Sequence, residues 1–274
     1  MKPPAHHDAT LDLTGSVSPE PRLYVLSRPT LDSNELDRFY ADEAVVWERT
    51  PEATQAEEVI EFSGRICYMS FGEQQSPKSN HDYIKHLIDQ THESVLEHAA
   101  WTFLLTGVSR AFTHQMVRHR VGFSFSQLSQ QYHDETAAKF VIPTEVRANE
   151  AAMRRWLQLI AELQQGYRSI TKELSGGDKR WDALSKEVRR SIRSATRSIL
   201  PNATETKIVF SANGRALRHF LDVRGGIIGD LEMRKVSALI YSRLEREAPA
   251  LLCDFEMIEH KDGYPLIRRK RATR

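Results

Sequence analysis

The sequence contains only two cysteines, Cys67 and Cys253, among 274 residues. Two cysteines cannot build a disulfide framework or a CxxC-type metal site, so we expect a reducing, cytoplasmic setting. No stretch approaches the roughly 18 consecutive apolar residues that span a bilayer. The polar, proline-rich start also lacks the apolar core of a secretion signal. We therefore expect no membrane partner.

Neither sign of charge is in excess, because 38 Lys and Arg residues oppose 37 Asp and Glu residues. A protein with this balance has no global basic field, so we expect no nucleic-acid partner. Any anion must be bound by a local group of cations.

Several common site motifs are missing. No GxGxxG follows a predicted strand and no GxxxxGK[ST] occurs, which argues against Rossmann and P-loop nucleotide sites. No HExxH spacing occurs either. The histidines come from different predicted elements, so we expect no metal site; they include His86, His92, His98, His114 and His119.

The order of predicted elements indicates an α+β fold, with few strands, many helices and no βαβ alternation. Apolar spacing and stop signals predict helices over 110–120, 144–174, 181–199 and 214–223, and strands over 99–108 and 206–211. Asn80 and Asp230 are predicted helix caps, and 121–132 is predicted to be a loop. We expect a flexible tail over 1–20, a single catalytic domain over 21–265 and a basic tail over 266–274.

The most informative segment is Arg118-His119-Arg120, at the end of a predicted helix. Helix carbonyls attract cations there, so the cluster could be a solvated helix end paired with acids. The next residues favour a binding role, because they offer many neutral hydrogen-bond donors. Arginines beside hydroxyls and amides suit a nucleotide phosphate. These donors are Ser124, Ser126, Gln127, Ser129, Gln130 and Gln131.

This segment resembles the signature of the flavin-dependent thymidylate synthases, in which Arg-His-Arg is followed by seven residues, a serine and a terminal Arg-Tyr. Other stretches in the same order are similar to the family, so the resemblance covers about residues 60 to 250. They are Glu97–Phe103 (EHAAWTF), Gln115, Arg197–Pro201 (RSILP), Asn213–Arg224 (NGRALRHFLDVR) and Glu232.

The resemblance implies a twisted, mostly antiparallel sheet packed with long helices, in a homotetramer with its sites between subunits. It implies FAD as cofactor, and NADPH and methylenetetrahydrofolate as co-substrates, for C5-methylation of a uracil nucleotide. The implied FAD contacts are Thr102, Arg118, His119, Arg120, Gln127, Asn213, Gly214, Arg215 and His219. The implied nucleotide contacts are Gln115, Arg118, Gln127, Leu128, Ser129, Gln131, Arg197 and Arg224.

The implied catalytic residues are Arg224 and Ser129. Arg224 matches the arginine that stabilises the ionised pyrimidine, and a fixed cation near the N3/O2 edge favours charge developing there. Cys67 and Cys253 lie in apolar settings without a local base, so reduced flavin is the expected hydride source in place of a thiolate route. Ser129 could be a nucleophile, but no obvious base lies near it in sequence, which favours a ligand-binding hydroxyl.

Three departures from the family pattern bear on the substrate. Eight residues separate Arg120 from Ser129, so one residue, Gly122 or a neighbour, is inserted. Gln131 replaces an arginine, and Asp230 replaces a usual glutamine. Losing one charged hydrogen bond costs roughly 1.5–3 kcal/mol, enough to weaken nucleotide binding tenfold or more.

These departures are compatible with three related hypotheses about the function. The first is methylation of dUMP. The second is a UMP-specific methylase of nucleoside biosynthesis, in which the lengthened loop bonds the 2′-hydroxyl. The third is a flavin-, nucleotide- or RNA-binding homologue that has lost catalysis.

Overall fold

The computed structural model describes residues 20–270, apart from the side chains of residues 178 and 179, and divides them into two compact units. The first unit holds residue 20 and residues 107–113 and 127–207. The second holds residues 21–106, 114–126 and 208–270. The expectations about residues 1–19 and 271–274 lie outside the described residues.

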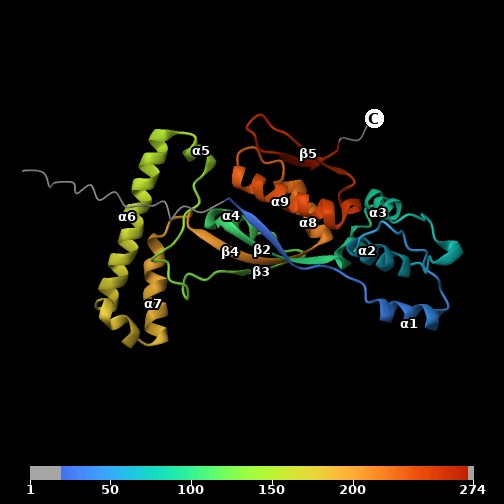
Figure 1. Cartoon of the computed structure of the whole chain (residues 1–274), viewed down its shortest axis with the longest axis horizontal. Helices are drawn as coiled ribbons and strands as arrows, with labels where there is room; N and C mark the ends of the chain where they lie inside the picture. Colours follow the sequence, from blue (N-terminus) through green and yellow to red (C-terminus); the bar gives the residue numbers. More distant parts are fainter. Residues whose placement is uncertain (1–19, 271–274) are drawn as a thin grey trace, which may run out of the picture. The chain divides into compact units, whose positions relative to one another are not determined.

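Helices and strands are mixed along the chain, which confirms the α+β class (Figure 1). A four-stranded sheet has the order β1-β2-β4-β3. Strand β1 runs antiparallel to β2, with Leu23 opposite Leu105. A second, two-stranded antiparallel sheet pairs β5 with β6. The strands are β1 Arg22–Ser27, β2 Ala100–Ser109, β3 Phe123–Gln127, β4 Glu205–Asn213, β5 Phe255–Ile258 and β6 Leu266–Arg269.

The second unit packs its helices around an aromatic and aliphatic core. Phe103 of β2 lies against Phe210 of β4, with ring centroids 5.1 Å apart. Helices α8 and α9 contact each other, and Val236, Ile240 and Leu244 of α9 are fully buried. The helices are α1 Ser33–Glu43, α2 Gln55–Ile66, α3 Asn80–Asp89, α8 Gly214–Arg224 and α9 Leu231–Glu247, with 3-10 turns Gly72–Gln74, Glu93–His98 and Pro249–Leu252.

The first unit contains the long amphipathic pair of helices α6 and α7, which contact each other. Ile160 and Tyr167 are buried on the inner side of α6. Gly176 ends α6 in the left-handed conformation, as its position in the sequence indicated. The helices are α5 Thr144–Arg147, α6 Glu150–Ser175 and α7 Lys186–Thr196, with 3-10 turns Asp178–Ala183 and Arg197–Ile199; α4 Arg110–Met116 contributes to both units.

Four details differ from the sequence expectations. Ser79 caps α3 through the N–H of Asp82, while the predicted cap, Asn80, bonds buried Glu61 instead. The predicted loop over 121–132 contains β3, and helix α7 begins at Lys186. Residues 266–269, expected in a basic tail, form β6 and bury Ile267. The predicted cap Asp230 does cap α9, accepting from the N–H of Met233 at 3.0 Å.

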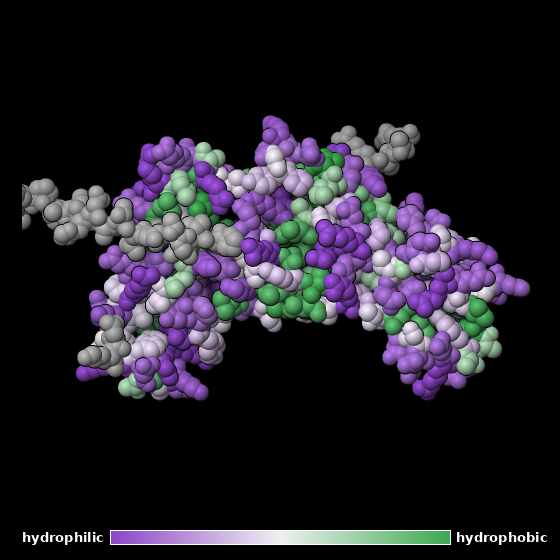
Figure 2. Space-filling view, viewed as in Figure 1, coloured by the Kyte–Doolittle hydropathy of each residue, from purple (hydrophilic) through white to green (hydrophobic). Residues whose placement is uncertain are grey.

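The surface view is largely hydrophilic, with hydrophobic side chains reaching it in places (Figure 2). Exposed apolar residues include Leu26 on β1 and Leu174 on α6, with 54% and 53% of their surface accessible. In the described part of the chain, no helix combines the length and apolar character that a membrane span requires.

Candidate functional site

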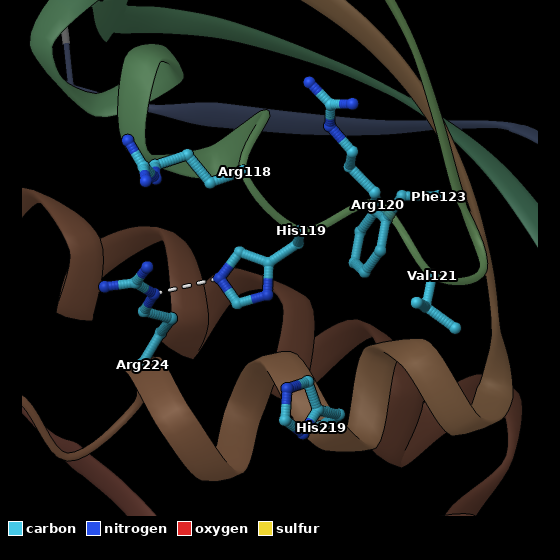
Figure 3. A pocket seen from close by; sticks show the side chains of 7 residues that line it. All are labelled: Arg118, His119, Arg120, Val121, Phe123, His219 and Arg224. Atoms are coloured by element: carbon cyan, nitrogen blue, oxygen red, sulfur yellow. Dashed lines mark hydrogen bonds between the residues drawn. The ribbon is translucent and has the colours of Figure 1, made fainter.

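A cavity of about 300 Å³ opens within the second unit, where the turn after α4 faces helix α8 (Figure 3). Its lining holds three arginines and two histidines and no carboxylate. The residues are Arg118, His119, Arg120, Val121, Phe123, His219 and Arg224. A volume near 300 Å³ is at the lower end for ligand pockets, so it suits one ring or one phosphate group.

A glycine fixes the turn that carries the Arg-His-Arg segment. Gly122 has a φ of +73°, and a Cβ there would lie 2.7 Å from the Cβ of Ala216 and 2.8 Å from Nδ2 of Asn213. The carbonyl of Gly122 accepts from the N–H of Asn213 at 3.2 Å, and Asn213 caps α8 through the N–H of Ala216. Only glycine allows this close approach, so the turn is pinned against the start of α8.

His119 and Arg224 meet at the centre of the cavity. Nε of Arg224 donates to Nε2 of His119 at 2.9 Å, so the imidazole accepts and carries its proton on Nδ1 (Figure 3). Burial lowers the pKa of His119, and the charges of Arg224 and His219 lower it further. A neutral imidazole therefore holds Arg224, whose two Nη groups bond no described residue.

Arg118 and Arg120 supply charge that nothing nearby neutralises. Both side chains are exposed, and within residues 20–270 neither forms an ion pair. Elsewhere in the same unit, the buried guanidinium groups of Arg218 and Arg234 are paired with Asp254 and Asp262, respectively. Two unpaired guanidinium groups beside an acid-free cavity provide binding capacity for an anion.

The other expected flavin contacts of the second unit lie outside the cavity lining. Thr102 Oγ1 lies 2.9 Å from Oγ of Ser211, on neighbouring strands. The N–H of Gly214 donates to the carbonyl of Ala99 at 2.8 Å, and a Cβ on Gly214 would meet the Leu96 carbonyl.

Arg215 is paired, unlike the arginines of the cavity. Its Nη1 bonds Glu97 at 2.7 Å and its Nε lies 3.6 Å from Glu93. The hydrogen bond to Glu97 raises the pKa of Arg215 further. This charge is therefore already compensated within the subunit, and it is less available to an anion than the charges of Arg118 and Arg120.

The expected nucleotide contacts from Gln127, the last residue of β3, to Arg197 belong to the first unit. Gln127 donates to Oγ1 of Thr113 at 3.0 Å and to Oγ1 of Thr206 at 3.3 Å. The N–H of Leu128 bonds the carbonyl of Lys207 at 2.9 Å, which holds the segment beside β4. Arg197 begins the 3-10 turn after α7 and forms no ion pair with the described residues.

Ser129 acts locally as a turn residue. Its Oγ accepts from the N–H of Gln131 at 3.3 Å, and its carbonyl accepts from the N–H groups of Tyr132 and His133. Among the described residues no base bonds this hydroxyl. The geometry therefore favours the ligand-binding hydroxyl over the nucleophile.

Two contacts were not anticipated from the sequence. Oε1 of Gln131 accepts from Nε of Arg190 at 3.3 Å. Gln115 donates through Nε2 to Oδ2 of Asp230 at 2.9 Å. The arginine spacing on α7 was the only sequence signal for the first contact, and the second had none.

The cavity residues fit one part of a flavin nucleotide. Its unpaired arginines match a phosphate group, and the lining also offers the aromatic rings of His119 and Phe123, which are tilted by 55° with centroids 6.1 Å apart. The cavity offers no thiolate nucleophile, because neither cysteine lines it. Burial also raises the pKa of Cys253, which disfavours its thiolate form. In the described residues, no group of three or more His, Cys, Asp or Glu side chains could hold a metal ion.

Comparison with known proteins places the chain in a family. Residues 50–250 match the family model described as thymidylate synthase complementing protein. The chain is 38% identical over 224 residues to a flavin-dependent thymidylate synthase of Mycobacterium sp. (strain KMS), covering 80% of this chain and 87% of the relative. It is 38% identical over 239 residues to that of Mycobacterium avium (strain 104), covering 86% and 93%. It is 36% identical over 228 residues to that of Corynebacterium aurimucosum, covering 82% and 90%. The chain therefore belongs to the flavin-dependent thymidylate synthases, a family of flavoprotein methyltransferases of nucleotide biosynthesis.

Proposed function

We propose that this protein methylates C5 of a uracil nucleotide, with bound FAD, methylenetetrahydrofolate as carbon donor and NADPH as reductant. The observation that carries the proposal is the acid-free cavity in which Arg118, Arg120 and Arg224 surround the neutral His119. FAD in its reduced form supplies the hydride needed to reduce the transferred carbon.

The remaining chemistry is assigned to the chain's own residues. Arg224 stabilises negative charge at the N3/O2 edge of the uracil through its two Nη groups. His119 is a positioning residue, because it holds Nε of Arg224 and leaves the rest of the guanidinium free. Arg118 and Arg120 bind phosphate oxygens of the FAD. Ser129 contributes a ligand-binding hydroxyl.

Product analysis by mass tests this proposal. The purified protein is incubated with methylenetetrahydrofolate, NADPH and either dUMP or UMP. A nucleotide that gains one CH₂ supports methylation, and one that gains CH₂O indicates hydroxymethylation. A yellow protein whose flavin is never reduced by NADPH would favour the catalytically impaired homologue instead.

UMP is kept as a second candidate substrate because of Gln115. A carboxylate can only accept hydrogen bonds, so Asp230 fixes the amide with Nε2 toward the carboxylate and leaves Oε1 without a partner among the described residues. An acceptor without a partner suits a hydroxyl donor such as the ribose 2′-OH, which dUMP lacks. A large preference for dUMP in parallel turnover assays would remove this candidate.

Assembly, domain limits and location complete the proposal. We propose a homotetramer with sites between subunits, supported by exposed apolar residues that include Tyr24, Leu26, Ile170 and Leu174. Light scattering after gel filtration would show a monomer if this is wrong. We propose that residues 21–265, together with strand β6, form the catalytic domain. We also propose that the protein acts in the cytoplasm, where the exposed Cys67 thiol stays reduced.

A further inference from the structure

One face of α7 carries guanidinium groups toward the turn formed by residues 129–132. Arg190, Arg193 and Arg197 are spaced by three and four residues, which aligns them along one side of the helix. Nη1 of Arg193 donates to the carbonyl of Tyr132 at 2.8 Å, and Nε of Arg190 donates to Oε1 of Gln131 at 3.3 Å. All of these residues belong to the first unit.

These three charges have no counter-charge within residues 20–270, where no carboxylate forms an ion pair with any of them. In addition, Nε of Arg193 is buried without an acceptor. Buried donors in folded proteins almost always have a partner. Unmatched charge together with an unsatisfied donor indicates a face that receives an anion.

Gln131 holds Arg190 in a defined orientation. Its Nε2 donates to Oγ of Ser194 at 3.4 Å, so its Oε1 must face the guanidinium. The Arg190 guanidinium also lies 5.3 Å from the ring centroid of Tyr132, a cation–π distance. With Nε occupied, Nη1 and Nη2 remain available for a bidentate contact with a phosphate.

We propose that Arg190, oriented by Gln131, binds the phosphate monoester of the uracil nucleotide beside Ser129 and Arg197. The signature that this segment resembles has an arginine at position 131, so Gln131 removes a cation from the turn. Arg190 of α7, held by Gln131, supplies a cation in its place. This inference rests on the proposed function.

Calorimetric titration of the purified protein separates the phosphate contact from recognition of the base. The ligands are dUMP and UMP, their nucleosides deoxyuridine and uridine, and inorganic phosphate. Arg190→Gln should weaken nucleotide binding about tenfold to a hundredfold and leave nucleoside binding unchanged within about twofold. Arg189→Gln is the matched control, since Arg189 is the neighbouring arginine and its side chain forms no hydrogen bond or ion pair with the described residues.

A charge-relocation variant sharpens the test. Gln131→Arg in the Arg190→Gln background returns the cation to the position that relatives use, and it should restore most of the lost affinity. Circular dichroism verifies that each variant remains folded.

Equal nucleotide affinity in the wild type and Arg190→Gln would overturn the phosphate role while leaving the proposed function standing. Equal losses of nucleotide and nucleoside binding would also overturn it. A wild-type protein that binds no uracil nucleotide would instead overturn both proposals.

Discussion

The hydrogen bond from Nε of Arg224 to Nε2 of His119, 2.9 Å long, joins residues 105 positions apart in the chain. It joins a turn after α4 to the last residue of α8. Because Arg224 carries a permanent charge, the bond favours the neutral imidazole and penalises its protonation. Edge-on contact with Phe220, at 5.2 Å between ring centroids, keeps the imidazole in a partly apolar setting.

This bond predicts a pH-dependent stability. The pKa of His119 is lowered from 6.5 by burial and by the charges of Arg224 and His219, so below pH 6.5 the unfolded chain binds more protons than the native state. The contribution of His119 is complete above pH 6.5 and is lost as the pH falls through its lowered native pKa. His119→Gln, which keeps an acceptor for Arg224, should reduce the loss of unfolding free energy between about pH 7.5 and pH 5.5.

Urea unfolding at the two pH values measures this effect. His86→Gln is the control, because His86 is exposed and its side chain forms no hydrogen bond or ion pair with a described residue. An identical pH dependence in wild type and His119→Gln would contradict the neutral-imidazole assignment.

Arg224→Ala should lower the rate of methylation about a hundredfold to a thousandfold while flavin remains bound. Removing one preorganised cation from the site of developing charge costs on the order of 10²–10³ in kcat. Arg118 and Arg120, which the change leaves intact, should keep the flavin, so the absorbance spectrum of the purified variant should still show it. Arg224→Lys keeps the positive charge but lacks the planar guanidinium group, so its kcat should lie between those of the wild type and Arg224→Ala. Loss of flavin from Arg224→Ala would contradict this division of roles.

The helices were predictable because residues that cap helices mark their ends in the sequence. Ser109 accepts from the N–H of Phe112, and Asp230 caps α9, as expected from residues that prefer these positions. Strand β3 was missed because serine and glutamine made 121–132 look like a loop. Its alternation of Phe123 and Phe125 with serines was the available signal, since the two rings stack 5.5 Å apart.

The site was predictable only where the motif resemblance reached. The resemblance grouped Arg118, His119 and Arg224, and in the structure these three residues line one cavity, although no local rule links residues a hundred positions apart. The contact between Gln131 and Arg190 lies outside the motif, and it depends on how one turn docks against α7. Contacts of that kind are set by tertiary packing, which spacing along the chain does not encode.

Gly122→Ala should destabilise the turn that carries the arginines. The new Cβ would be forced into the left-handed region and against Ala216 and Asn213, so we expect a loss of roughly 2–4 kcal/mol in unfolding free energy. Gly263→Ala isolates the backbone part of this cost, because Gly263 has a φ of +81° with nothing within 4 Å. That control should lose about 1–2 kcal/mol. Equal losses in the two variants would contradict the close approach at Gly122.

Asp230 offers the most direct control over the choice of sugar. One of its oxygens caps α9 and the other accepts from Gln115, so the two roles can be separated. Asp230→Ser keeps a capping oxygen for the N–H of Met233 but is too short to hold Gln115, whose amide can then turn.

If Oε1 of Gln115 selects a ribose hydroxyl, Asp230→Ser should lower the ratio of kcat/KM for UMP to that for dUMP by about fivefold to tenfold, the effect of one hydrogen bond. Its melting temperature should stay close to that of the wild type. Asp230→Ala loses both roles, so it should show the same change in ratio and an additional loss of about 1 kcal/mol from the missing cap. An unchanged ratio of the two kcat/KM values in both variants would mean that Gln115 does not distinguish the two sugars. The contact with Asp230, the only one that fixes the Gln115 amide among the described residues, would then have no effect on substrate choice.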